Sequence, residues 1–179
     1  MTDPSTIIAT YICAKDGNRP WLMRQAFTTD SVLKMDVKSK AISFPALTQG
    51  IEDMTYVLVR SFARDYENVY TFCLTDPPAH DAQQFSCDWL VAMSGKQSGD
   101  LRVGCGRYDW VFGSGNTAAA TDLKITISHM QIFDPEHIDA AMTWVSALPY
   151  PWCQPEQAVR DMPKLAGLGE IARYIEQIR

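Results

Sequence analysis

LRVGCGRYDWVF, residues 101–112, has the residue types of a β-strand, but its apolar positions change parity halfway along. They are odd in the first half and even in the second: Leu101, Val103 and Cys105, then Tyr108, Trp110 and Phe112. Because the side chains of a strand alternate between two faces, both sets share one face only if a residue is inserted between them. The sequence therefore predicts a strand with a one-residue bulge near residues 104–106.

Three further stretches around this strand also alternate with a period of two, as strands of a sheet do. Their apolar sets are Tyr70, Phe72 and Leu74; Phe85, Cys87, Trp89, Val91 and Met93; and Leu123, Ile125 and Ile127. His129 continues the parity of the last set. The stretches SGKQSGD (94–100) and GSGNTAAAT (113–121) predict the connecting turns, so we expect four antiparallel strands.

Helical signals lie on both sides of these strands. An Asp-Pro pair precedes the first and the last helix, where Asp can serve as the N-cap and Pro as the first helical residue. The expected helices lie near residues 3–17, 18–27, 51–62 and 135–148. Residues 28–43 predict a weak strand or a short hairpin.

This order of elements predicts an α+β fold with the helices gathered against one sheet. We expect residues 1–148 to form the α+β domain. Residues 149–179 are rich in Pro and Gly and are expected to be an extension that packs on the domain or on a partner subunit, with a short helix near residues 171–178.

Composition limits the class of protein. The 179 residues, 46% of them hydrophobic, suit one domain with a continuous core, and the net charge of −5 argues against nucleic acid as a partner. No apolar run approaches the roughly 20 residues of a membrane helix, and the start lacks a signal peptide, so we expect no membrane partner and a cytoplasmic location. Five scattered cysteines and three histidines predict reduced thiols and no metal site.

Four stretches in this order carry a resemblance: AFTTDSVLKM (26–35), TQGIEDMTYVLVRSF (48–62), VGCGRYDWVF (103–112) and TDLKITISHMQIF (121–133). Over residues 5–147 the chain resembles the SnoaL-like branch of the nuclear transport factor two superfamily. The resemblance implies a cone, in which a curved antiparallel sheet wraps around about three N-terminal helices and leaves an apolar pocket. It also implies a hydrophobic small molecule as ligand, no cofactor and a homodimer formed through the sheet.

The resemblance also implies a pocket carboxylate at Asp16, between the first two helices. In dehydratase and dehydrochlorinase members such a carboxylate orients a histidine that removes a proton, because imidazole titrates near neutral pH. This chain has Tyr70 where that histidine is expected. Asp16 can also be explained as ordinary Asp-Gly turn chemistry.

Two more residues are candidates for acid/base chemistry. His129, if it shares the face of Ile127, would point into the pocket and could meet a carboxylate; the alternative is a histidine that only completes the core. Asp88 lies between Cys87 and Trp89, so it faces the pocket only if those two residues face outward. The sequence leaves this choice open.

Aromatic residues are the expected ligand contacts, namely Tyr108, Trp110, Trp89, Trp21 and Tyr56. Apolar pockets with a few polar groups are the usual form of a small-molecule site, and a tyrosine there can donate a hydrogen bond to an oxygen. Packing alone would also account for Tyr108 and Trp110.

These residues support two functions. The first is a cofactor-independent lyase, dehydratase or isomerase that acts on a hydrophobic substrate, with Asp16, His129, Asp88 and Tyr70 as the catalytic candidates. The second is a non-catalytic ligand-binding or assembly module of the same fold, since one framework hosts many functions.

Overall fold

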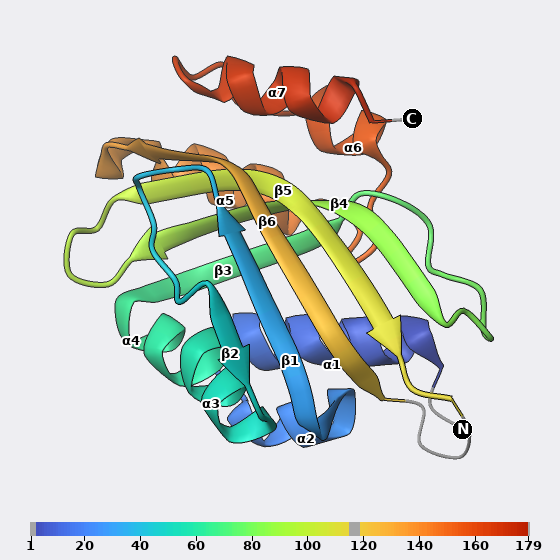
Figure 1. Ribbon diagram of the computed structural model, residues 1–179. Helices are drawn as coiled ribbons and strands as arrows, with labels where there is room; N and C mark the ends of the chain where they lie inside the picture. Colours follow the sequence, from blue (N-terminus) through green and yellow to red (C-terminus); the bar gives the residue numbers. More distant parts are fainter. Residues whose placement is uncertain (1–2, 115–118, 179) are drawn as a thin grey trace.

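In the described residues, 3–114 and 119–178 of a computed structural model, a six-stranded sheet of order β2-β1-β6-β5-β4-β3 curves around the N-terminal helices (Figure 1). Its strands are β1 (Phe27–Val37), β2 (Leu47–Gln49), β3 (Tyr66–Cys73), β4 (Gln84–Gly95), β5 (Leu101–Phe112) and β6 (Ala120–Phe133). Neighbouring strands are antiparallel apart from β1 and β6, which are parallel. The predicted α+β cone is confirmed, while part of the turn expected at 113–121 lies outside the described residues.

The concave face of the sheet packs on α1 and on a broken helix. Asp3 caps α1 (Pro4–Asp16) by accepting a hydrogen bond from the Thr6 amide at 2.9 Å, as the sequence predicts. The other helices on this side are η1 (Pro20–Leu22), α2 (Met23–Ala26), α3 (Ile51–Thr55), the π-helical η2 (Tyr56–Ser61) and α4 (Phe62–Asp65). The predicted second helix is shorter than expected, because Phe27 already begins β1.

The bulge predicted in residues 104–106 is not in that strand. β5 pairs with β4 without interruption, whereas on its other side Cys105 pairs with His129 and Gly106 pairs with Ile127. The extra residue is therefore Ser128 of β6. The change of parity within β5 has another cause. Helices cover both faces of the sheet, so apolar side chains are needed on both sides of the strand.

Two separate apolar clusters make use of the two faces of β5. Tyr108, Trp110 and Phe112 belong to the core inside the cone. Leu101, Val103 and Cys105 belong to a second cluster on the outer face, and the expectation that both sets share a face is wrong.

The C-terminal quarter of the chain supplies the helices of the outer cluster. Its helices are η3 (Pro135–His137), α5 (Ile138–Ser146), α6 (Pro155–Arg160) and α7 (Leu168–Glu176), and α5 to α7 lie against the convex face of the sheet (Figure 1). Trp144 of α5 donates its indole N–H to the Ala158 carbonyl at 2.9 Å, and Ile171 and Ile175 of α7 are fully buried. No helix in the described residues is long and apolar enough to span a membrane.

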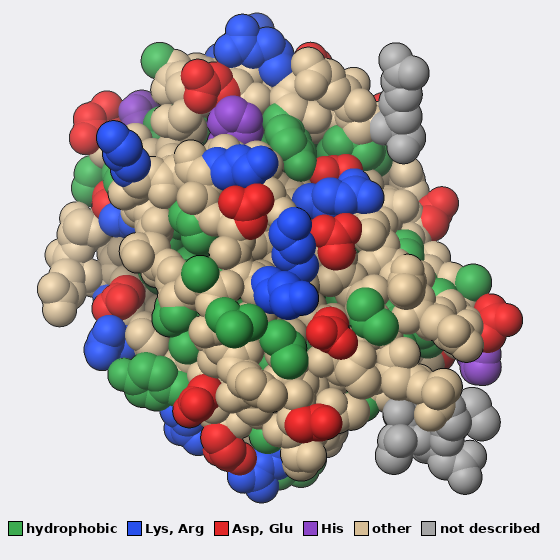
Figure 2. Space-filling view, in the orientation of Figure 1, with side chains coloured by type: hydrophobic (Ala, Val, Ile, Leu, Met, Phe, Trp, Pro, Cys, Tyr) green, Lys and Arg blue, Asp and Glu red, His purple; other side chains and the backbone are tan. Residues whose placement is uncertain are grey.

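The part of the outer face that these helices leave open is charged. Basic and acidic side chains lie side by side over it (Figure 2). On β5, Arg107 and Asp109 form an ion pair at 3.3 Å, and Ser86 of β4 donates a hydrogen bond to Asp109 at 2.6 Å. The sheet therefore changes from apolar to polar on its outer side where the covering helices end.

Gly106 is required where β5 passes Thr126 and Trp89. A Cβ atom added there would overlap the Thr126 carbonyl and lie 2.9 Å from the Trp89 ring. We expect Gly106→Ala to lower the free energy of unfolding by about 1–3 kcal/mol, the usual effect of overpacking, in a urea titration.

Gly169 of α7 is the matched control, because a Cβ added there would meet no atom within 4 Å. Ala is the better helix former, so Gly169→Ala should leave stability unchanged or raise it slightly. Equal stability of the two variants would contradict the close approach at Gly106.

Candidate functional site

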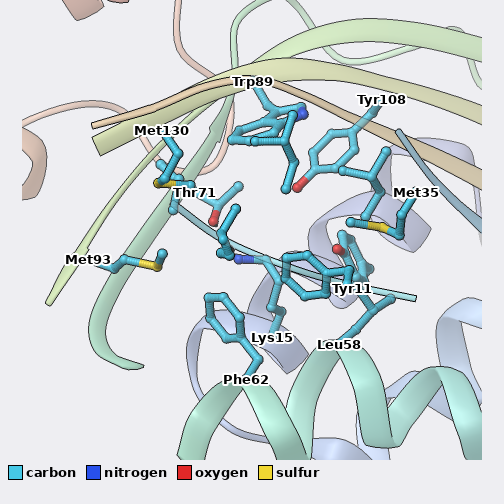
Figure 3. A pocket seen from close by; sticks show the side chains of 15 residues that line it. Tyr11, Lys15, Met35, Leu58, Phe62, Thr71, Trp89, Met93, Tyr108 and Met130 are labelled. Atoms are coloured by element: carbon cyan, nitrogen blue, oxygen red, sulfur yellow. Dashed lines mark hydrogen bonds between the residues drawn. The ribbon is translucent and has the colours of Figure 1, made fainter. Parts of the chain in front are cut away.

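A cavity lies between the concave face of the sheet and the helices (Figure 3). The space within it measures about 440 Å³ including its opening. Its lining comes from every layer of the cone: Tyr11, Lys15, Met35, Ile42, Phe44, Leu58, Phe62, Thr71, Trp89, Val91, Met93, Tyr108, Ile125, Ile127 and Met130. The chain thus has an apolar pocket with a small number of polar groups, the usual form of a small-molecule site.

Sulfur and aromatic rings dominate the wall of this cavity. Met35, Met93 and Met130 are unbranched and can change shape around a ligand. Trp89 and Tyr108 stack with ring centroids 5.7 Å apart and both line the cavity, and a ligand contact by either stays a prediction. Trp110 is only 1% exposed and lies behind the lining, where it packs on Tyr11 and Phe27.

Lys15 is the charged residue of the cavity lining, and the sequence reasoning missed it. Its Nζ lies 2.7 Å from Asp16 Oδ1 and 2.7 Å from Thr71 Oγ1, and 4.9 Å from the centroid of the Phe62 ring. The side chain is 8% exposed. One signal was available: Lys15 follows Tyr11 by four residues and thus extends the buried stripe of α1.

Asp16 lies behind the cavity lining and hydrogen-bonds the residues around Lys15. Besides Lys15, its carboxylate accepts hydrogen bonds from the Thr71 amide at 2.7 Å, the Thr71 hydroxyl at 2.8 Å and the Tyr150 hydroxyl at 2.8 Å. A carboxylate offers about four acceptor positions, so both oxygens are fully used. Asp16 bonds to β3 and to the C-terminal segment rather than to the turn at Gly17.

Two buried donors at the cavity have no partner within the described part of the chain. These are the Tyr11 hydroxyl and the Trp89 indole N–H. Burial raises the pKa of Tyr11 and of Tyr108, so both phenols stay protonated and able to donate. A buried polar group without a partner costs about 1–3 kcal/mol, a penalty that a ligand or an ordered water can remove.

His129 does not face the cavity, and the expectation that it shares the face of Ile127 is wrong. The extra residue Ser128 reverses the parity of β6. The imidazole packs on Tyr174 of α7, with ring centroids 5.9 Å apart, and its Nδ1 lies 3.9 Å from Glu170.

Asp88 and Tyr70 also lie on the outer side of the sheet. Asp88 accepts a hydrogen bond from the Tyr174 hydroxyl at 2.6 Å and lies 3.6 Å from Arg107. Tyr70 packs against the outer cluster, while the next residue, Thr71, points into the cavity. The question of parity left open for Asp88 is thus answered: Cys87 and Trp89 face inward.

The two remaining aromatic candidates are exposed. Trp21 of η1 is 69% exposed and does not line the cavity. Tyr56 is 54% exposed and lines a second hollow, beside the segment from residue 40 to residue 45. A ligand contact by either residue stays a prediction.

The cysteines are free thiols, and all but Cys13 are buried. Burial raises the pKa of the Cys105 thiol to about 12 and that of Cys153 to about 11. Within the described residues, no three His, Cys, Asp or Glu side chains are placed so that they could hold a metal ion.

Removing one partner of the buried Lys15–Asp16 pair should destabilise the fold. We expect Lys15→Met to lower the free energy of unfolding by about 3–5 kcal/mol, because the Asp16 carboxylate would remain buried without its cation. The double variant Lys15→Met/Asp16→Asn should recover most of this loss in a urea titration.

Arg24 and Glu52 provide the matched control, since this pair lies 2.9 Å apart with side chains 68% and 72% exposed. Arg24→Met and Glu52→Gln should show far smaller changes and little coupling, as exposed pairs do. If the losses of unfolding free energy caused by Lys15→Met and Asp16→Asn simply add in the double variant, the two side chains do not act as a pair.

Comparison with known proteins identifies the fold but not the function. No family model matches the sequence, and no curated protein sequence is similar to it. A nuclear transport factor 2-like superfamily protein from Salmonella enterica serovar Typhimurium is similar in structure, with a TM-score of 0.57, 16% identity, and 70% of this chain and 88% of that chain covered.

Two further solved structures are similar. A hexachlorocyclohexane dehydrochlorinase has a TM-score of 0.57 at 8% identity, covering 71% of this chain and 84% of its own. A protein with a ketosteroid isomerase-like fold from Catenulispora acidiphila, in complex with trimethylamine, has a TM-score of 0.51 at 17% identity, covering 69% of this chain and 85% of its own. The chain therefore has the fold of the nuclear transport factor two superfamily, as its sequence resemblance predicts.

Proposed function

We propose that the cavity binds a small, largely apolar molecule that carries one neutral oxygen acceptor, such as a carbonyl group. The observation that carries this proposal is the Lys15 ammonium, which is buried in an apolar lining. An ammonium has three N–H donors, and in the described residues two of them are taken by Asp16 and Thr71. No acceptor in the described residues takes the third. Nζ lies 4.9 Å from the centroid of the Phe62 ring, and Lys15 lines the cavity.

The charge of the site favours a neutral acceptor over an anion. Asp16 lies 2.7 Å from Lys15 and compensates its charge, so the pair as a whole is neutral. A carboxylate ligand would bring a second negative charge into the same buried region, where an uncompensated charge is costly. A carbonyl oxygen accepts the hydrogen bond without that penalty.

Binding without catalysis suits the lining better than proton transfer does. Among the described lining residues, the ionisable groups are Tyr11, Lys15 and Tyr108, all hydrogen-bond donors in their ordinary protonation states. The nearby carboxylate, Asp16, has both oxygens occupied. A general base must reach the proton that it removes, and no carboxylate or imidazole among the described lining residues does so.

A lyase or isomerase without a cofactor is the second candidate. Lys15 and Tyr108 line one cavity and could together polarise a carbonyl, which is how donors stabilise a developing oxyanion. The structural likeness to a hexachlorocyclohexane dehydrochlorinase supports this candidate, since one fold can host several chemistries.

A panel of three probes tests the proposal, namely cyclohexanone, cyclohexanecarboxylate and methylcyclohexane, titrated and followed by protein NMR. We expect cyclohexanone to bind most tightly. Lys15→Met/Asp16→Asn should weaken its binding roughly 10-fold to 100-fold, the value of one charge-assisted hydrogen bond, while the surface variant Arg24→Met/Glu52→Gln leaves it unchanged. Tightest binding of the carboxylate, or no difference between the variants, would overturn the proposed acceptor site.

The same ketone in D2O separates binding from catalysis. A binding protein should not accelerate exchange of the hydrogens next to the carbonyl, measured by proton NMR. Exchange that depends on both protein and Lys15 would instead establish proton transfer and favour the second candidate.

The predicted homodimer and the cytoplasmic location stay predictions. A dimer through the sheet would have to use the part of the outer face that α5 to α7 leave open, which includes Arg107 and Asp109.

A further inference from the structure

A second hollow adjoins the cavity on its outer side. It is lined by the segment from residue 40 to residue 45 and by side chains of η2, α4 and the start of β3, among them Tyr56, Ser61, Asp65 and Tyr66. Its empty space, including the part open to solvent, is about 900 Å³, compared with about 440 Å³ for the cavity. The hollow is large enough to hold part of a ligand.

Only a thin partition separates the two spaces. Ile42, Phe44 and Phe62 line both the cavity and the hollow, so each of these side chains has one space on either side. Ile42 and Phe44 are half-buried, and they belong to a segment outside helices and strands. We call these three side chains the partition.

The segment that carries most of the partition is hydrogen-bonded at its ends, and between them Ile42 and Phe44 pack on the inner core. At one end the Ala41 carbonyl accepts a hydrogen bond from Arg102 at 2.7 Å, and at the other the Ala46 carbonyl accepts one from the Met35 amide at 2.9 Å. Within the described structure, residues 42–45 make no backbone hydrogen bond. The middle of the segment is therefore held by side-chain packing and not by backbone hydrogen bonds, so its local stability is lower than that of the neighbouring strands.

Arg102 also gives the hollow a fixed wall. Its guanidinium donates to the Tyr66 hydroxyl at 3.1 Å and lies 5.2 Å from the centroid of the Tyr66 ring. Asp100 pairs with it at 3.2 Å, and the two side chains are only 17% and 16% exposed. One wall of the hollow is thus fixed by hydrogen bonds, whereas the partition is held by side-chain packing.

The hollow differs from the cavity in chemistry. It offers hydroxyl groups from Ser43, Ser61 and Tyr56, and its two charged residues, Lys40 and Asp65, have opposite signs. Hydroxyls both donate and accept, and the opposed charges favour neither an anion nor a cation. Tyr56 adds an aromatic ring that is 54% exposed, so packing within the chain does not account for most of its surface.

We propose that the hollow is the second half of the ligand site. The ligand is a neutral amphiphile, with a compact apolar part in the cavity and a short hydroxylated tail that passes the partition into the hollow. This inference rests on the proposed function, because the apolar part must first occupy the cavity.

Three ketones test the inference: cyclohexanone, and cyclohexanone with either an ethyl or a hydroxyethyl group on the ring carbon opposite the carbonyl. We expect the hydroxyethyl ketone to bind about threefold to tenfold more tightly than the ethyl ketone, since one hydrogen bond contributes about 0.5–1.5 kcal/mol. Ser43→Ala/Ser61→Ala should remove this preference and leave the affinity for cyclohexanone unchanged.

Ser146→Ala is the matched control, because Ser146 lies at a different hollow, beside α5 and β3. This variant should keep the preference. If cyclohexanone itself does not bind, the proposed function fails and the inference fails with it. If cyclohexanone binds but the hydroxyethyl ketone binds no more tightly than the ethyl ketone, or its preference survives in Ser43→Ala/Ser61→Ala, the inference alone is overturned.

Discussion

The buried pair of Lys15 and Asp16 connects the parts of the chain that build the site. Asp16 ends α1, Thr71 lies on β3, and Tyr150 belongs to the C-terminal segment, and all three meet at one carboxylate. A buried charge is tolerated only when it is paired and hydrogen-bonded, so this pair constrains the relative positions of helix, sheet and C-terminal segment. The polar end of the cavity exists because these contacts are complete.

The C-terminal segment belongs to the same structure. Pro151 and Cys153 form backbone hydrogen bonds with Cys73 at the end of β3, at 2.7 Å and 3.0 Å. These bonds carry Tyr150 to Asp16, and further along the chain α7 covers the outer face of β5. The segment thereby supports the site on one side of the sheet and supplies an apolar layer on the other.

The cavity combines a rigid polar end with an adaptable apolar wall. Lys15 and Thr71 are held by short hydrogen bonds, whereas Met35, Met93 and Met130 contribute unbranched side chains that can adapt to a ligand. A rigid donor sets the orientation of a ligand, and a soft wall allows its shape to vary. This division suits a protein that recognises one functional group on several related molecules.

The sequence by itself determined an α+β order of helices and strands, since helix caps, the amphipathic stripe after Gly50 and the period-two strands are all local patterns. The cone was implied by the resemblance to SnoaL-like proteins. It also identified Asp16, Trp89 and Tyr108 near or at the cavity. It could not determine which face of a strand looks inward, because apolar residues on β5 occupy both faces once α5 to α7 cover the outside.

Tertiary structure decided the chemistry of the site. The bulge at Ser128 turns His129 outward. On β3, Tyr70 points outward, and the neighbouring residue Thr71 points into the cavity. The spacing of Lys15 after Tyr11 indicates burial, but its hydrogen bond at 2.7 Å to Thr71, far away in the chain, is a property of the tertiary structure. Side-chain parity and long-range pairing depend on how the sheet is covered, and no local pattern contains that information.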